Sequence, residues 1–187
     1  MAVFVSLIAL STSVSNAQTF RLNPKTFSMV ISGTTNVHDF ETKVTQMSGE
    51  LVINGSKQVQ SMVVNVPVRS IKSNEKLMDT KTYETFNDEK YPNITFRMVE
   101  VNSLQVNGND VSVVVTGNLT MAGVTRKITL KPVGKNIKPG AYQFKGSVDL
   151  KMSDFKMKPP TAMLGMMKVG DGIKLKYDVT FEGTPAN

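Results

Sequence analysis

Apolar and polar residues alternate over most of the chain. Every second position is apolar in much of 141–152, and the same period recurs in 173–182. A period of two is typical of β-strands that have one dry face and one wet face. The pattern therefore predicts two strands of about ten residues here. Further strands are predicted at 62–68, 94–98 and 111–121, with shorter ones at 27–32, 39–45, 49–54 and 125–131.

Turn residues separate these predicted strands. The pairs are Asn54-Gly55, Asn107-Gly108, Ala122-Gly123 and Pro139-Gly140, which favour tight connections between antiparallel strands. One segment, 73–92, breaks the alternation and is rich in Glu, Lys and Leu. It predicts a short helix that Ser73 would cap. The fold class is therefore all-β and antiparallel, with one short helix.

About eight antiparallel strands form either a two-sheet sandwich or a closed barrel. Strands of ten residues span about 33 Å, which is long for a small sandwich. A sheet of that length loses its exposed edges most simply by closing on itself. We therefore predict a barrel of about eight strands. Its inward positions are mostly Val, Ile, Leu, Met and Phe, so an internal cavity would be dry and long.

The amino-terminal segment has the features of a signal peptide. Residues 1–17 carry no charge, include an apolar run from Val3 to Leu10 and end in Ser15-Asn16-Ala17. We predict removal of residues 1–17, a single domain over 18–187, and a periplasmic or secreted location. No other stretch approaches the ~20 apolar residues of a membrane-spanning helix. The chain has no cysteine, which excludes disulfides, thiolate metal sites and cysteine nucleophiles.

Positive charge is concentrated in the last third of the chain. From Val124 onward there are twelve Lys and Arg against five Asp and Glu, whereas the preceding residues balance at ten against ten. A basic exported protein attracts acidic surfaces such as phospholipid headgroups, so transient contact with a membrane surface is expected. Nucleic acid is not an expected partner. The sequence has no Trp, no run of five basic residues and no interleaving of aromatic with basic residues.

Four separated stretches together resemble the YceI-like family of exported proteins. In chain order they are GTTNVHDFE, KLMDTKTYETFNDEKYPNITF, VTGNLTMAGVTRKITL and SDFKMKPPTAMLGMMKVGDGIKLKYDVTFE, between about Phe27 and Glu182. The resemblance implies an extended lipocalin-like antiparallel β-barrel that binds a long amphiphile, with polyisoprenoids as the ligand class and no established catalysis. Phe40 stands where many relatives have Trp, which keeps an apolar ring and loses an indole donor.

Two sets of apolar residues are candidates for the lining of a pocket. The first set faces inward from the predicted strands: Val64, Val66, Phe96, Met98, Val113, Val115, Phe144 and Val148. The second lies in Lys156–Gly172, a long connection that contains four methionines. Methionine reshapes around different apolar partners, so this loop is expected to act as a lid or as a plug for the barrel. Its predicted ligand contacts are Met163, Leu164 and Met166.

Three residues are candidates for contact with a polar headgroup. Arg69 lies near a strand end and Lys76 lies in the predicted helix, so either cation could bind a phosphate or carboxylate at the pocket mouth. His38 is the only histidine, and a structural role at the start of a strand competes with a ligand contact. Solvent exposure is the simplest alternative for each cation.

The sequence contains no recognisable catalytic signature. Gly-x-Ser-x-Gly, His-Glu-x-x-His and phosphate-binding glycine loops are all absent, so we predict no enzyme, no catalytic residue and no metal site. The leading hypothesis is a binding protein that sequesters or carries a long-chain amphiphile, an isoprenoid or another lipid, and needs no other cofactor. An accessory to membrane redox chemistry that handles a quinone-like molecule and a lipid-modifying enzyme remain as alternatives. A homodimer is compatible with the sequence.

Overall fold

In the computed structural model, residues 17–54 and 58–183 are described, apart from the side chains of Ala162 and Met163. Residues 1–16 of the predicted signal peptide and Gly55 of the first predicted turn lie outside these ranges. Within the described part of the chain, no helix has the length and apolar character needed to cross a membrane.

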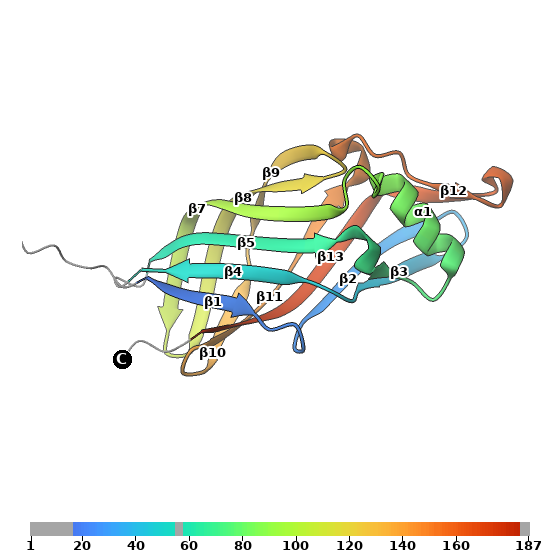
Figure 1. The fold of residues 1–187 in the computed structure, drawn as a ribbon. Helices are drawn as coiled ribbons and strands as arrows, with labels where there is room; N and C mark the ends of the chain where they lie inside the picture. Colours follow the sequence, from blue (N-terminus) through green and yellow to red (C-terminus); the bar gives the residue numbers. More distant parts are fainter. Residues whose placement is uncertain (1–16, 55–57, 184–187) are drawn as a thin grey trace, which may run out of the picture.

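Among the described residues, eight antiparallel strands close into a barrel, which confirms the predicted fold class (Figure 1). Their order around the barrel is β1, β4, β5, β7, β8, β10, β11 and β13, and the ring closes where β1 pairs with β13. Their bounds are β1 Gln18–Leu22, β4 Ser48–Ile53, β5 Val59–Pro67, β7 Asn93–Asn107, β8 Asp110–Met121, β10 Val133–Lys138, β11 Ala141–Lys151 and β13 Met167–Gly183.

The long strand β13 extends the barrel beyond this ring. Its carboxyl-terminal part pairs with β1, and its earlier residues pair with β2 (Ser28–Thr35). From β2 the sheet continues through β3 (Asp39–Val44) to β6 (Ile71–Lys72). Strand β9 (Val124–Leu130) is not part of the ring and pairs antiparallel with β8. Figure 1 shows β2, β3 and the helix α1 (Lys76–Phe86) at the same end of the molecule.

Bulges explain where the predicted strand bounds were too short. β7 continues to Asn107, although the alternation suggested an end near Met98, because register shifts at 98–100 and 101–103 change the phase of its side chains. β13 begins at Met167 and not near Ile173, and the pairing with β2 shifts register between Val169 and Ile173. The alternation did not predict strands β1, β6 and β10.

The connection before β13 is therefore shorter and more structured than predicted. It contains the 3₁₀ turns η2 (Met152–Phe155) and η3 (Met163–Gly165) and the two-residue strand β12 (Thr161–Ala162), which pairs with β13. A third 3₁₀ turn, η1 (Val68–Ser70), follows β5. The connection thus contains a short strand that pairs with the first residues of β13.

The predicted helix is present, but its predicted cap is wrong. Glu75 is the N-cap of α1 and makes no side-chain cap hydrogen bond. The Ser73 hydroxyl instead donates to the carboxylate of Asp79, 2.8 Å away in the first turn. The helix ends at Phe86, and its C-cap residue Asn87 takes a left-handed conformation with φ 50°. Such a residue terminates a helix by turning the chain away from its axis.

Candidate ligand-binding cavity

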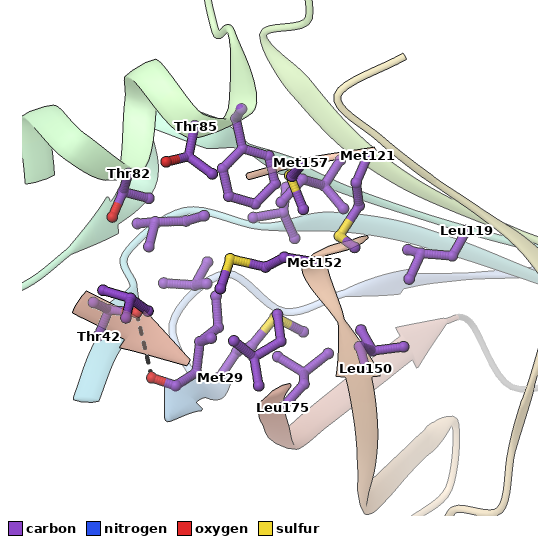
Figure 2. A pocket seen from close by; sticks show the side chains of 18 of the residues that line it. Met29, Thr42, Thr82, Thr85, Leu119, Met121, Leu150, Met152, Met157 and Leu175 are labelled. Atoms are coloured by element: carbon purple, nitrogen blue, oxygen red, sulfur yellow. Dashed lines mark hydrogen bonds between the residues drawn. The ribbon is translucent and has the colours of Figure 1, made fainter. Parts of the chain in front are cut away.

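An apolar cavity of about 140 Å³ lies inside the barrel beneath α1. Figure 2 shows Thr82 and Thr85 of the helix on one side of it, with Met29 and Leu175 from strands on the other. Its lining is Met29, Ile31, Phe40, Thr42, Val44, Val64, Val66, Ile71, Met78, Thr82, Thr85, Phe86, Ile94, Phe96, Leu119, Met121, Leu150, Met152, Met157, Pro160, Val169, Ile173 and Leu175. We call this space the first cavity.

Hydrocarbon makes up nearly all of the first cavity wall. Among the described residues that line it, only three threonines carry a side-chain oxygen or nitrogen. Two of these hydroxyls are already used, because Thr42 donates to the carbonyl of Ile31 at 3.4 Å and Thr85 donates to that of Lys81 at 2.7 Å. A water molecule needs two to four polar partners to occupy a buried site. The wall therefore favours an apolar occupant.

A second apolar cavity of about 120 Å³ lies further along the barrel. Its lining is Met29, Met47, Leu51, Val59, Met62, Val64, Met98, Val101, Leu104, Val111, Val113, Val115, Pro132, Phe144, Tyr177, Val179 and Phe181. Tyr177 is the one described residue of this lining whose side chain has an oxygen or nitrogen atom. Met29 and Val64 line both cavities, so the two spaces meet at these side chains.

Strand register fixes the place where the cavities meet. Tyr177 on β13 pairs directly with Met29 on β2 and with Gly146 on β11. Directly paired residues of antiparallel strands project from the same face, so these three form one row across the inner wall. Leu175, two residues earlier on β13, already lines the first cavity. We call Met29, Val64 and Tyr177 the waist of the barrel.

Methionine is the most adaptable component of both walls. Eight of the twelve methionines in the chain line one or both cavities: Met29, Met47, Met62, Met78, Met98, Met121, Met152 and Met157. An engineered apolar cavity of about 150 Å³ holds one benzene ring, so each space by itself accepts only a short segment of a lipid. Unbranched methionine side chains can shift to join the spaces around a longer chain.

A surface groove leads into the first cavity. It has a volume of about 200 Å³ and is lined by Glu75, Leu77, Met78, Lys81, Pro160, Thr161, Met167 and Val169. Three of these residues, Met78, Pro160 and Val169, also line the first cavity. The ammonium of Lys81 lies 2.7 Å from the carboxylate of Glu84. We call this space, which lies between α1 and the segment before β13, the entrance groove. Its floor is apolar, and the charged residues Glu75 and Lys81 lie at its rim.

Most of the predicted strand residues lie in the cavity walls. Val64, Val66 and Phe96 line the first cavity, and Val64, Met98, Val113, Val115 and Phe144 line the second. Val148 is half-buried and lines neither, although Phe144 and Leu150 on the same strand do. Whether any of these side chains contacts a ligand stays a prediction.

The predicted loop residues lie elsewhere. Leu164 is fully exposed and Met166 is 69% exposed, so the structure places both outside the cavity walls. The side chain of Met163 is not described. Left-handed backbone at Leu164 (φ 57°) and Gly165 (φ 88°) turns this segment at its tip. The same connection contributes Met157, which is buried, and Pro160 to the first cavity.

The three predicted headgroup residues do not converge on the entrance groove. His38 is exposed in the turn between β2 and β3, where its backbone carbonyl accepts hydrogen bonds from the backbone and hydroxyl of Thr35. Lys76 is exposed at the start of α1. Among the lysines of the helix, Lys81 is the one whose side chain lines the groove. The headgroup roles of His38 and Lys76 stay predictions.

Arg69 is engaged in a contact within the protein. Its guanidinium donates to the nearly buried carboxylate of Asp88 and lies 5.9 Å from the ring centre of Tyr83. The hydrogen bond to Asp88 raises the pKa of Arg69. Elsewhere in the described ranges, no group of three His, Asp or Glu side chains could hold a metal ion.

The comparisons with known proteins agree with this geometry. The sequence profile of the YceI-like domain matches residues 15–181. The UPF0312 protein of Pseudomonas aeruginosa (strain LESB58) is 35% identical over 102 residues. That match covers 51% of each protein, so the chain spans about half the length of the curated relatives it matches.

Two solved structures show the same fold. BcnA of Burkholderia cenocepacia superposes with a TM-score of 0.67 at 19% identity, over 85% of this chain and 98% of that one. A polyisoprenoid-binding domain from Saccharophagus degradans superposes with a TM-score of 0.73 at 13% identity, over 88% and 98%. Because the family profile covers nearly the whole chain, this protein belongs to the YceI-like family.

Proposed function

We propose that this protein binds the apolar chain of a long amphiphile, an isoprenoid or a related lipid, inside the barrel and carries or sequesters it. The observation that carries the proposal is the pair of hydrocarbon-lined cavities joined at Met29 and Val64. The family and the polyisoprenoid-binding domain from Saccharophagus degradans support a binding protein rather than an enzyme.

The entrance groove supplies a path for the ligand. Its apolar floor continues into the first cavity through Met78, Pro160 and Val169, so the tail enters between α1 and the segment before β13. The charged groups of Glu75 and Lys81 stay at the rim, where a polar head would remain hydrated. Each buried methylene contributes about 0.8 kcal/mol, so a dozen carbons supply roughly 10 kcal/mol before ordering costs.

We place this activity outside the cytoplasm, because residues 1–17 have the pattern of a signal peptide. Loading would occur at a membrane surface. Val37, Leu77, Leu164 and Met166 are exposed apolar residues. They belong to the β2–β3 turn, to α1 and to the connection before β13, and Figure 1 shows β2, β3, α1 and β12 at the same end of the molecule. Asn36 holds two of these segments together, since its amide nitrogen donates to the carbonyl of Met166 at 2.8 Å. Such an apolar rim on a basic protein suits brief contact with anionic lipid.

Organic extraction of the full chain, purified from cells that export it, tests the proposal. Mass spectrometry of the extract should detect an isoprenoid or similar lipid at a substantial fraction of the protein concentration. The delipidated protein should then take up added farnesol or geranylgeraniol in a titration. An extract without lipid, together with no uptake of either alcohol, would overturn the carrier function.

A further inference from the structure

One side chain with a polar atom, Tyr177, lines the second cavity. The hydroxyl oxygen of Tyr177 is buried and, within the described residues, is the only buried side-chain oxygen or nitrogen without a hydrogen-bond partner. Native proteins satisfy the large majority of such atoms, so an exception calls for an explanation. We propose that Tyr177 is a ligand-binding residue whose hydroxyl donates a hydrogen bond to an acceptor oxygen carried within the ligand chain. This inference rests on the proposed carrier function.

The neighbouring strands leave room for this hydroxyl at the waist. Gly146 is the direct partner of Tyr177 on β11, and a Cβ atom there would lie 2.4 Å from the tyrosine hydroxyl. The glycine therefore lets the phenol ring lie against the inner wall. The ring lines the second cavity, and its strand neighbour Leu175 lines the first. A donor is thus placed where an occupant would pass from one space to the other.

The chemistry of the site selects the acceptor. Burial raises the pKa of Tyr177 to about 12, so the hydroxyl keeps its proton and remains able to donate. Thr42 and Thr85 in the first cavity already donate to backbone carbonyls. The structure therefore favours a ligand that carries a ketone, ester or ether oxygen at this depth over a ligand of the same length that lacks it.

Matched ligands test this assignment. Tridecane, 2-tridecanone and 7-tridecanone would each compete with an apolar fluorescent dye for the wild-type chain and for Tyr177→Phe. The substitution keeps the ring and removes the donor. For at least one ketone, the affinity relative to tridecane should fall by roughly 3- to 10-fold in the variant, as expected for one neutral hydrogen bond. Tyr142→Phe, at a tyrosine that lines neither cavity, should leave the ratio unchanged.

The carbonyl stretch of the bound ketone supplies a direct second readout. With ¹³C at the carbonyl, infrared absorption should lie at a lower frequency in wild type than in Tyr177→Phe. The role of Tyr177 would be overturned if wild type and Tyr177→Phe had the same ketone-to-tridecane affinity ratios and the same carbonyl frequencies. The carrier function would still stand if tridecane bound to both proteins. Failure of the delipidated wild-type chain to bind any of the three molecules would overturn both.

Discussion

Tyr177 has a stability cost that its position explains. A buried hydroxyl without a partner loses its hydration and gains no hydrogen bond in return, at a cost of about 1–3 kcal/mol. In the ligand-free protein, Tyr177→Phe should therefore raise the free energy of unfolding by about 1 kcal/mol, measured by urea denaturation. Tyr142→Phe is the matched control. A less stable Tyr177→Phe variant would show that the hydroxyl has a partner in the ligand-free state.

The same residue makes stability depend on alkaline pH. A tyrosine in the unfolded chain ionises near pH 10, whereas burial raises the pKa of Tyr177 to about 12 in the folded chain. The neutral form is thus favoured by folding, so its contribution is complete below pH 10 and is lost as the pH rises to about 12. Unfolding experiments should show a loss on the order of 2 kcal/mol over this range. Tyr177→Phe should not show that component.

Arg69 and Lys81 are expected to behave differently. Arg69→Ala leaves the nearly buried carboxylate of Asp88 without its cation, so the melting temperature should fall. The relative affinity for farnesyl phosphate and farnesol should not change, because Arg69 does not line the entrance groove. Lys81→Ala should weaken binding of the phosphate more than that of the alcohol. If the affinity ratio of farnesyl phosphate to farnesol changed in Arg69→Ala and not in Lys81→Ala, Arg69 would be the headgroup contact, as the sequence predicted.

At the scale of elements, we expect the waist to control the length of the ligand chain that fits inside the barrel. Met29 lines both cavities, and a phenyl ring in its place would stiffen and fill their junction. In a series of 1-alkanols from hexanol to tetradecanol, wild-type affinity should rise about fourfold per methylene until the spaces are full. In Met29→Phe the rise should stop at a shorter chain.

The exposed variant Met166→Phe is the control for this series, because Met166 lies outside both cavities. It should reproduce the wild-type dependence on chain length. If a folded Met29→Phe protein showed the wild-type dependence of affinity on alkanol length, the alkyl chain of the ligand would not pass the waist.

Alternation predicted the long elements well because one face of each strand is dry. Val64, Val113 and Phe144 were placed in the interior from their phase alone, and they do line the cavities. The later part of β7 could not be predicted in this way, because two register shifts move apolar residues such as Val106 to the surface. A bulge depends on the neighbouring strand, which a local pattern does not contain.

Composition indicated the methionine-rich connection but not its orientation. The turn at Leu164 and Gly165 sends Leu164 into solvent, while Met157 packs into the wall. The role we infer for Tyr177 could not be predicted from the sequence either. It depends on the pairing of β13 with β2 and β11, which brings Met29 and Gly146 beside the ring. In the sequence, Tyr177 is one of the alternating apolar positions of 173–182, which indicates only that it faces inward.

For the whole molecule, the barrel is a hydrocarbon interior enclosed by a basic surface. In the function we propose, the net charge of +7 and the exposed apolar rim would favour approach to anionic membranes, and the two cavities would accept an apolar chain from them. The adaptable part of the structure is the wall itself, because eight methionines line the cavities. A rigid wall of β-branched residues would accept fewer kinds of apolar ligand.

These methionines also provide the most direct test of an occupied interior. The protein would be labelled with ¹³C at its methionine methyl groups and titrated with farnesol while the methyl spectrum is recorded. The signals of Met29, Met62, Met98, Met121 and Met152 should shift and show nuclear Overhauser contacts to the ligand, whereas that of the exposed Met166 should not shift. A response from Met166 with unchanged wall methionines would place the ligand outside the barrel and contradict internal binding.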